Sequence, residues 1–232
     1  MNRLDRLAGE VLGTPLLIEP GKAKAILSTL APRIGVSGVE APDYAAALFG
    51  ESDQDAPTMR IRDGIALVNV SGSLVHRTGG VAAASGLRTY DAIGAELAAA
   101  ANDPEVGGIL LDVNSPGGQA SGAFELADTI REIRKVKPVW AVANAHAFSA
   151  AYAIAASADR LFVLPHSGGV GSIGVIMWHV DESAANEKRG VVPTPIFAGS
   201  HKIDNSPHAP LSDDARSENQ ADRIGGVSLA DK

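Results

Sequence analysis

The feature that most constrains the fold is a regular alternation of short apolar runs with helical patterns, which begins near residue 61. Residues 65–70, 108–113 and 138–143 have the composition of buried strands, while the segments 90–101 and 120–136 between them carry apolar residues at helical spacing. Strands and helices in alternation predict a largely parallel sheet with helical crossovers. The sequence therefore predicts an α/β fold.

The same alternation continues toward the C-terminus and predicts further elements there. We expect strands at 160–164, 172–178 and 192–197, and helices at 149–158, at 180–189 and from 212 onward. Residues 1–34 are expected to form an N-terminal arm with a helix at 21–30. Residues 35–60, rich in Pro, Gly, Ser and Asp, are expected to form a linker. The main domain is then expected to span 61–224, followed by an atypical tail at 225–232.

Composition excludes several classes of function. The 232 residues contain no cysteine, so neither a disulfide nor a thiolate metal site is expected. A net charge of -7 with scattered Lys and Arg gives no electrostatic footprint for nucleic acid. The histidines show no metal-ligand spacing, and we expect no cofactor. The chain starts without a signal-peptide pattern and has no apolar run that could span a bilayer, so no membrane partner is expected.

A candidate nucleophile, Ser149, lies where the predicted strand at 138–143 leads into an Ala-rich helix. A serine at a strand-to-helix junction can be an exposed nucleophile that faces a helix N-terminus. The alternative is that Ser149 is only the N-cap of the helix, since serine is favoured at that position. The stretch by itself leaves both interpretations open.

A second candidate stretch, residues 115–118, reads Ser-Pro-Gly-Gly and follows a predicted strand. Gly117 and Gly118 allow backbone N–H groups to approach a ligand closely, as an oxyanion hole requires. The alternative is an ordinary Pro-Gly turn. A phosphate loop is excluded, because the glycine spacing is wrong and no Lys-Ser or Lys-Thr follows.

A third candidate stretch, residues 199–204, contains Lys202 beside His201. A lysine can act as a general base only where burial keeps it neutral, since its ordinary pKa is about 10.4. His201 is the competing base, and a solvated surface lysine is the alternative without function. In an extended segment only one of these neighbours could face Ser149. Ser172 could orient a lysine amine, or could be a plain strand-start residue.

Taken together, the motifs at 112–118, 147–152, 171–175 and 199–204 resemble the S49 peptidase family, the signal peptide peptidase A group. That resemblance covers roughly residues 61–220 and implies a ClpP/crotonase-like fold of repeated β-β-α units. Within the family, the sequence is most similar to the phage head-maturation proteases of the minor capsid protein C type.

Carried over by motif, the resemblance implies a Ser-Lys serine endopeptidase. Ser149 is then the nucleophile and Lys202 the base, and Ser172 steadies the Lys202 amine. The N–H groups of Gly118 and Ala150 form the oxyanion hole, next to Gly117. Relatives have Gly-Gly after the serine where this chain has Ala-Ala, and alanine still supplies the N–H.

The resemblance also implies the setting in which the protein acts. Its substrates are expected to be phage scaffold and portal proteins, cleaved within the procapsid during assembly. The protein itself is expected in the cytoplasm of a bacterial host or as the product of a prophage. A homo-oligomer is expected as well. The ending at 225–232 is unlike family sequence, which leaves truncation or a shifted reading frame open as explanations.

Two other functions fit parts of the sequence. A non-catalytic assembly protein could retain the fold, and the unusual ending favours that alternative. An acyl-CoA enzyme of the crotonase type would share the fold, but it would need a CoA site and no Ser-Lys pair.

Overall fold

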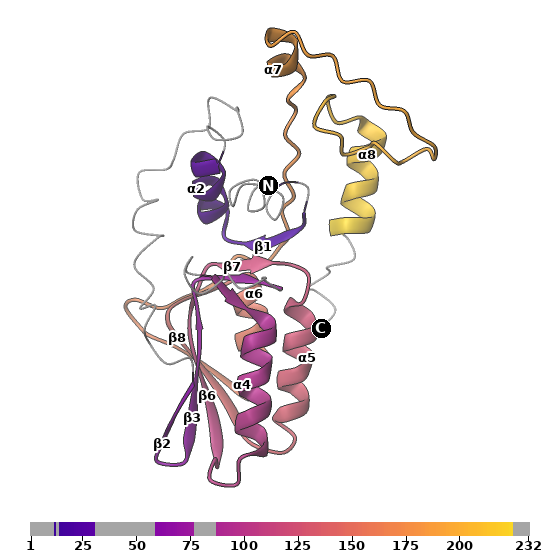
Figure 1. Cartoon of the computed structure of the whole chain (residues 1–232). Coiled ribbons are helices and arrows are strands. Elements are labelled where there is room, and N and C mark those ends of the chain that lie inside the picture. The colour runs from indigo at the N-terminus through magenta and orange to yellow at the C-terminus, as the bar shows by residue number, and fades with distance from the viewer. Residues whose placement is uncertain (1–11, 13, 31–58, 77–86, 225–232) are drawn as a thin grey trace. The chain divides into compact units, whose positions relative to one another are not determined.

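The computed structural model describes residues 12, 14–30, 59–76 and 87–224 (Figure 1). By its internal contacts the chain divides into two compact units. The sheet unit comprises residues 17–19 and 46–174, and the helical unit comprises 1–16, 20–45 and 175–232. Each unit is described by itself below. The predicted linker lies almost entirely outside the described residues, so the predicted domain boundaries stay predictions.

The sheet unit is built on a six-stranded sheet with the strand order β10-β8-β6-β3-β2, in which β9 also pairs with β8. All of these pairs are parallel except the antiparallel hairpin of β2 and β3. The strands are β2 (Met59–Arg62), β3 (Ile65–Ser71), β6 (Gly108–Ser115), β8 (Val139–Phe148), β9 (Arg160–Val163) and β10 (Gly169–Gly171). The predicted α/β fold with a largely parallel sheet is confirmed.

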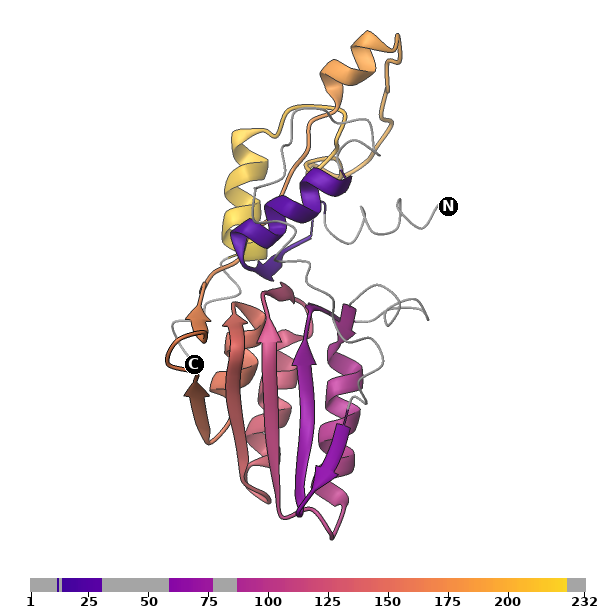
Figure 2. The ribbon, with the colours of Figure 1, turned by 90° about the vertical axis from the view of Figure 1, so that its left-hand side faces the viewer.

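One face of this sheet is covered by helices α4 (Tyr90–Asn102), α5 (Ala123–Ile133) and α6 (Ala150–Ala156) (Figures 1 and 2). Alternate strand residues are buried against them, as the two-residue period of a strand requires. The core formed in this way includes Val68, Val70, Leu111, Val113, Ile93, Leu97, Leu126, Ile130 and Ile154. Burial of each such side chain contributes about 1.5–3 kcal/mol, so this layer holds the unit together.

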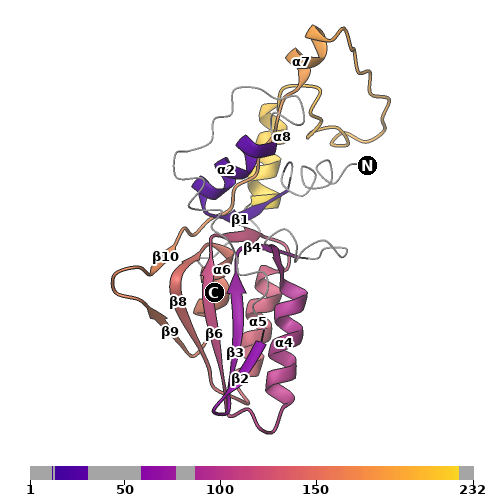
Figure 3. The same ribbon diagram turned by 60° about the vertical axis from the view of Figure 1, so that its left-hand side comes forward.

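A second, smaller sheet forms where the central strands end. Its strand order is β1-β7-β4-β5, with β1 (Leu16–Ile18), β7 (Gly117–Gln119), β4 (Ser73–Val75) and β5 (Leu87–Thr89). Strand β4 follows β3 after Gly72, and β7 follows β6 after Pro116. Figure 3 shows β4 next to the carboxyl end of β3. The alternative of an ordinary Pro-Gly turn at 115–118 is therefore wrong in part, because Gly117 and Gly118 belong to a short strand.

The predicted strand at 172–178 is also wrong. Ile176 and Trp178 form only isolated bridges, and the regular strand of this region, β10, precedes them. The backbone at Ser172 has φ 54° and at Gly174 φ 145°, so the extended conformation is interrupted twice.

Residues 192–197 form no strand in the described part of the chain, although a strand is predicted there. Pro193 and Pro195 lack the N–H donors that a sheet ladder requires. The predicted strand at 138–143, in contrast, continues to Phe148, because β10 pairs with its last three residues.

The helical unit contains α2 (Pro20–Leu30), α7 (Ser183–Lys188), α8 (Asp213–Glu218) and a π-helical segment, η3 (Asn219–Ile224). Leu16 and Ile176 exchange two backbone hydrogen bonds, of 2.8 and 2.9 Å. The predicted helix at 21–30 is confirmed by α2. Within the described ranges, no helix has the length and apolar character needed to cross a membrane.

Candidate active site

Ser149 is the single residue between strand β8 and helix α6, and it is fully buried. Its N–H donates to the carbonyl of Gly171 at 2.8 Å, and its Oγ donates to the carbonyl of Gly174 at 3.3 Å. Its own carbonyl accepts the N–H of Ala153 at 3.0 Å, as the first carbonyl of a helix does. The side chain is thus held from the loop after β10.

The backbone of Ser149 adopts φ 54° and ψ −115°, a conformation that non-glycine residues rarely take. Ser149 occupies the N-cap position of α6, yet its side chain makes no hydrogen bond to the helix N–H groups. A capping hydroxyl would accept such a bond, so the N-cap alternative does not explain the serine. Strained backbone of this kind costs about 1–3 kcal/mol and clusters at functional sites.

The described part of the chain has three non-glycine residues with positive φ, and two of them are predicted site residues. They are Asp63, Ser149 and Ser172. Ser172 is exposed and lies in the sheet unit, in the same loop as the acceptor of the Ser149 hydroxyl. Its predicted role, to steady the Lys202 amine, stays a prediction, because Ser172 and Lys202 belong to two units that are each described by themselves.

Gly117 packs against the two peptides that flank Ser149. A Cβ at this position would lie 2.9 Å from the carbonyl oxygen of Phe148 and 3.1 Å from the backbone nitrogen of Ala150. It would also lie 2.2 Å from the carbonyl oxygen of Leu17. With φ at 93°, the position strains any other residue as well. Glycine here lets the start of β7 approach the start of α6.

Ser115 fixes the direction of this glycine segment, a role that the sequence analysis missed. Its fully buried side chain donates to the carbonyl of Gly72 at 2.7 Å and accepts the N–H of Gly117 at 3.1 Å. The N–H of Gly117 is therefore engaged within the protein. The available signal in the sequence was a serine directly before Pro-Gly-Gly.

Two backbone N–H groups remain as candidate oxyanion donors. Ala150 is the first residue of α6, so its N–H has no acceptor inside the helix. Gly118 lies in β7, opposite Leu74 of β4, and a Cβ there would lie 1.7 Å from the carbonyl oxygen of Leu74. The predicted pairing of Gly118 and Ala150 N–H groups at one oxyanion stays a prediction.

Tyr90 supports this segment from helix α4. Its hydroxyl donates to the carbonyl of Gln119 at 2.7 Å, one residue beyond Gly118, and its side chain is buried. Burial, with a smaller contribution from the charge of Glu125, raises the pKa of the Tyr90 hydroxyl. Tyr90 therefore stays a neutral donor.

We expect Tyr90→Phe to lower the free energy of unfolding by about 1–2 kcal/mol, because a partly buried carbonyl loses its donor. The wild type should also lose stability above pH about 10, where the tyrosine ionises in the unfolded chain but not in the native one. Urea unfolding at pH 7 and at high pH measures both effects. An equally steep high-pH loss in Tyr90→Phe would show that Tyr90 is not its source.

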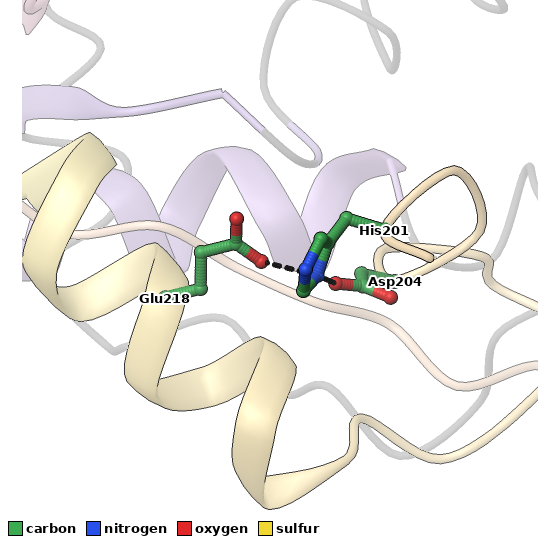
Figure 4. Close-up of side chains that lie close together, drawn as sticks. All are labelled: His201, Asp204 and Glu218. Atoms are coloured by element: carbon green, nitrogen blue, oxygen red, sulfur yellow. Dashed lines mark hydrogen bonds and ion pairs between the residues drawn. The ribbon is translucent and has the colours of Figure 1, made fainter. Parts of the chain in front are cut away.

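Lys202 is exposed, in a turn of the helical unit. Next to it, Nδ1 of His201 lies 2.8 Å from Oδ2 of Asp204 and 2.9 Å from Oε2 of Glu218 (Figure 4). These two carboxylates raise the pKa of His201, the hydrogen bond to Asp204 more than the charge of Glu218. Among the described residues, His201, Asp204 and Glu218 form the one group of His, Cys, Asp or Glu side chains that could hold a metal ion, because their possible ligand atoms all lie within 4.8 Å of one another. The two carboxylates favour the protonated form of His201, whose positive charge opposes theirs.

Lys22 was not singled out from the sequence, yet it is a buried lysine. It lies in the first turn of α2 and is 7% exposed. Burial lowers the pKa of its amine. No motif around a lone lysine near a helix start signals this, since burial depends on residues distant in the sequence.

Comparison with known proteins supplies two family matches. Residues 131–223 match Peptidase family S49, and residues 79–170 match Clp protease. Among solved structures, an enoyl-CoA hydratase/isomerase family member aligns with a TM-score of 0.34 at 17% identity, over 44% of each chain.

Two phage proteins match almost the whole chain. Capsid assembly protease C of Escherichia phage lambda is 40% identical over 229 residues, which are 93% of this chain and 52% of that protein. Head-tail preconnector protein GP5 of Enterobacteria phage P21 is 38% identical over 229 residues, 94% of this chain and 46% of that protein. The chain thus spans about half the length of these curated relatives. The predicted resemblance is confirmed: part of this chain matches Peptidase family S49, and most of its length is similar to phage capsid assembly protease C.

Proposed function

We propose that this chain is a serine endopeptidase in which Ser149 is the nucleophile and Lys202 the general base. The observation that carries the proposal is the strained backbone of Ser149 between β8 and α6, with a hydroxyl that does not cap the helix. Strain without a structural role at a strand-to-helix junction is typical of a nucleophile. The match to Peptidase family S49 supports the same assignment.

The proposed reaction has two stages. A neutral Lys202 amine takes the proton of the Ser149 hydroxyl, which leaves its resting acceptor, the Gly174 carbonyl, and Oγ forms a bond to the substrate carbonyl carbon. The resulting ammonium returns the proton to the departing amine nitrogen as the peptide C–N bond breaks. Water, deprotonated by the same lysine, then cleaves the acyl ester and regenerates Ser149.

The developing oxyanion needs preorganised donors, and we assign the N–H groups of Gly118 and Ala150 to this task. Removing one such donor typically costs about 10²–10³-fold in kcat. Gly117 contributes by its missing side chain, because a Cβ there would press on the Ala150 nitrogen. Ser115 and Tyr90 hold the segment that carries these glycines.

The observations support the choice of base less directly than the choice of Ser149 as nucleophile. Because Lys202 is exposed, bound substrate or another copy of the chain must supply the desolvation that keeps its amine neutral. This requirement fits an enzyme that acts only within an assembly. Lys22 is a second candidate base, favoured by its burial and by its lowered pKa.

We further propose that the substrates are proteins of phage head assembly, such as scaffold and portal proteins, cleaved inside the procapsid. The names of the two phage relatives, a capsid assembly protease and a head-tail preconnector, support this assignment. A homo-oligomer agrees with the need to desolvate Lys202. The peptide itself could pair with an exposed strand edge near Ser149.

The test is cleavage of a diverse peptide library at several pH values, read by mass spectrometry. We expect Ser149→Ala to lose at least about 10³-fold in rate and Lys202→Met about 10²–10⁴-fold. Lys22→Met, a change of similar volume, should keep wild-type cleavage. Loss in Lys22→Met but not in Lys202→Met would move the base to Lys22, and loss only in His201→Gln would move it to His201.

The alternatives make different predictions in the same experiment. Cleavage that persists in Ser149→Ala would contradict the serine mechanism. A well-folded wild type without any cleavage, and without labelling of Ser149 by a fluorophosphonate probe, would favour a non-catalytic assembly protein. Turnover of an acyl-CoA thioester that is independent of Ser149 would favour the crotonase-type enzyme.

A further inference from the structure

The turn that carries Lys202, residues 199–205 (the Lys202 turn), is linked to the C-terminal helices by side chains. His201 lies between Asp204 of the same turn and Glu218 of α8, with both carboxylate oxygens within 2.9 Å of its Nδ1 (Figure 4). Two of the turn's backbone hydrogen bonds are long, 3.4 Å from the Lys202 nitrogen to the Gly199 carbonyl and 3.5 Å from the Asp204 nitrogen to the His201 carbonyl, whereas the Ser206 nitrogen lies 2.8 Å from the Ile203 carbonyl. The side-chain links therefore add to a backbone that is only partly held by its own hydrogen bonds.

A second link joins the same two segments. The side-chain amides of Asn205 and Asn219 exchange two hydrogen bonds, of 2.7 and 3.3 Å, and Asn219 is buried. Asn219 begins η3, one residue after Glu218. The end of the Lys202 turn and a residue before Lys202 are thus attached to neighbouring residues of one helical stretch.

We propose that His201 with Glu218, and Asn205 with Asn219, form a two-point clamp of positioning residues that holds the turn bearing Lys202 and so directs its amine. The inference rests on the proposed function, in which Lys202 is the base. His201 acts through Lys202 and touches neither substrate nor nucleophile in this assignment.

Charge explains why the clamp depends on protonation. Two carboxylates share Nδ1, which carries at most one hydrogen in either protonation state of the ring, so the difference between the states lies in the positive charge and not in the number of donors there. Only the imidazolium attracts both oxygens electrostatically. The charged groups that face His201 are Asp204 of its own turn and Glu218 and Asp214 of α8, all acidic. They favour the protonated ring together.

The pH dependence follows from the direction of this shift. The pKa of His201 is raised in the native state, so its stabilising contribution is complete below pH about 6.5 and is lost as the pH rises through the raised pKa. A neutral lysine base gives a rising limb of the rate with pH. Loosening of the clamp adds a falling limb, and the two give a bell-shaped profile.

The first experiment follows the His201 ring by NMR titration in the full chain. We expect a pKa above the ordinary value of about 6.5 in the wild type and a lower one in Glu218→Gln and in Asp204→Asn. Hydrogen exchange of residues 199–205 should speed up in the same variants. Glu187→Gln, an exposed charge change on α7 of the same unit, is the matched control and should alter neither readout.

The second experiment measures peptide cleavage against pH. Glu218→Gln should shift the falling limb to lower pH and reduce kcat about tenfold with KM unchanged, since a misplaced catalytic group affects chemistry rather than binding. A profile in Glu218→Gln that matches Glu187→Gln, while Lys202→Met is inactive, would overturn the clamp and leave the proposed function standing.

Two further outcomes also decide the question. Activity that is lost with EDTA and restored by Zn²⁺ or Mn²⁺ would show that the carboxylates and His201 hold a cation, and would overturn the proton clamp. Full cleavage by Lys202→Met would refute the proposed base and with it the positioning role. The NMR and exchange data would then report only on a structural link.

Discussion

Gly118→Ala is expected to destabilise the sheet unit by at least about 3 kcal/mol, the upper range for overpacking. An added Cβ would lie 1.7 Å from the carbonyl oxygen of Leu74, and 2.5 and 2.7 Å from its carbonyl carbon and Cα. All three are backbone atoms, so no side chain can rotate away. Strand β7 would have to separate from β4, and the small sheet would lose its centre. Urea unfolding with an unchanged m-value measures the loss.

Gly94→Ala is the matched control for this substitution. Gly94 lies inside helix α4, and a Cβ there would meet only Cδ1 of Leu126, at 3.8 Å, an ordinary contact. Alanine is favoured over glycine in a helix interior by about 1 kcal/mol, so the control should be more stable than the wild type. A Gly118→Ala protein as stable as Gly94→Ala would contradict the close approach of β7 and β4.

Ser149→Gly and Ser149→Ala are expected to lose cleavage equally and to differ in stability. Both remove the hydroxyl and its 3.3 Å hydrogen bond to the Gly174 carbonyl. Only glycine also removes the Cβ that makes φ 54° costly. The glycine variant should therefore be about 1–2 kcal/mol more stable than the alanine variant.

Urea unfolding of the two variants, with library cleavage run in parallel, measures both effects. An alanine variant as stable as the glycine variant would show that the backbone of Ser149 is not strained. Cleavage retained by either variant would contradict the assignment of Ser149 as the nucleophile. We expect a glycine variant that is more stable than the alanine variant and that has no activity. Such a trade of stability against activity is typical of an active site that holds backbone strain for function.

The sequence by itself predicted the elements whose patterns are local. Strands β3 and β6 and helices α4, α5 and α2 were predicted, because apolar spacing along one segment is enough to show which face is buried. It also identified Ser149 and Gly117–Gly118 as unusual positions. Their neighbours in the chain, a strand before each and a helix after the serine, were visible without any long-range information.

The two strand predictions that were wrong show the limit of what a local sequence pattern can predict. Residues 192–197 are apolar enough for a strand, but Pro193 and Pro195 cannot pair, and residues 172–178 are interrupted by positive φ at Ser172 and Gly174. Whether an apolar run becomes a strand depends on a partner that offers hydrogen bonds. That partner is chosen by the tertiary fold.

Only the tertiary structure decided what the candidate residues do. It showed that the Ser149 hydroxyl does not cap its helix, that the Gly117 N–H is taken by Ser115, and that Lys22 is buried while Lys202 is exposed. It also brought His201 between Asp204 and Glu218. Each of these facts depends on atoms from distant segments meeting within a few ångströms. A residue's type and local spacing therefore identified the candidate groups for the chemistry, whereas packing determined their hydrogen bonds, their burial and the charges around them.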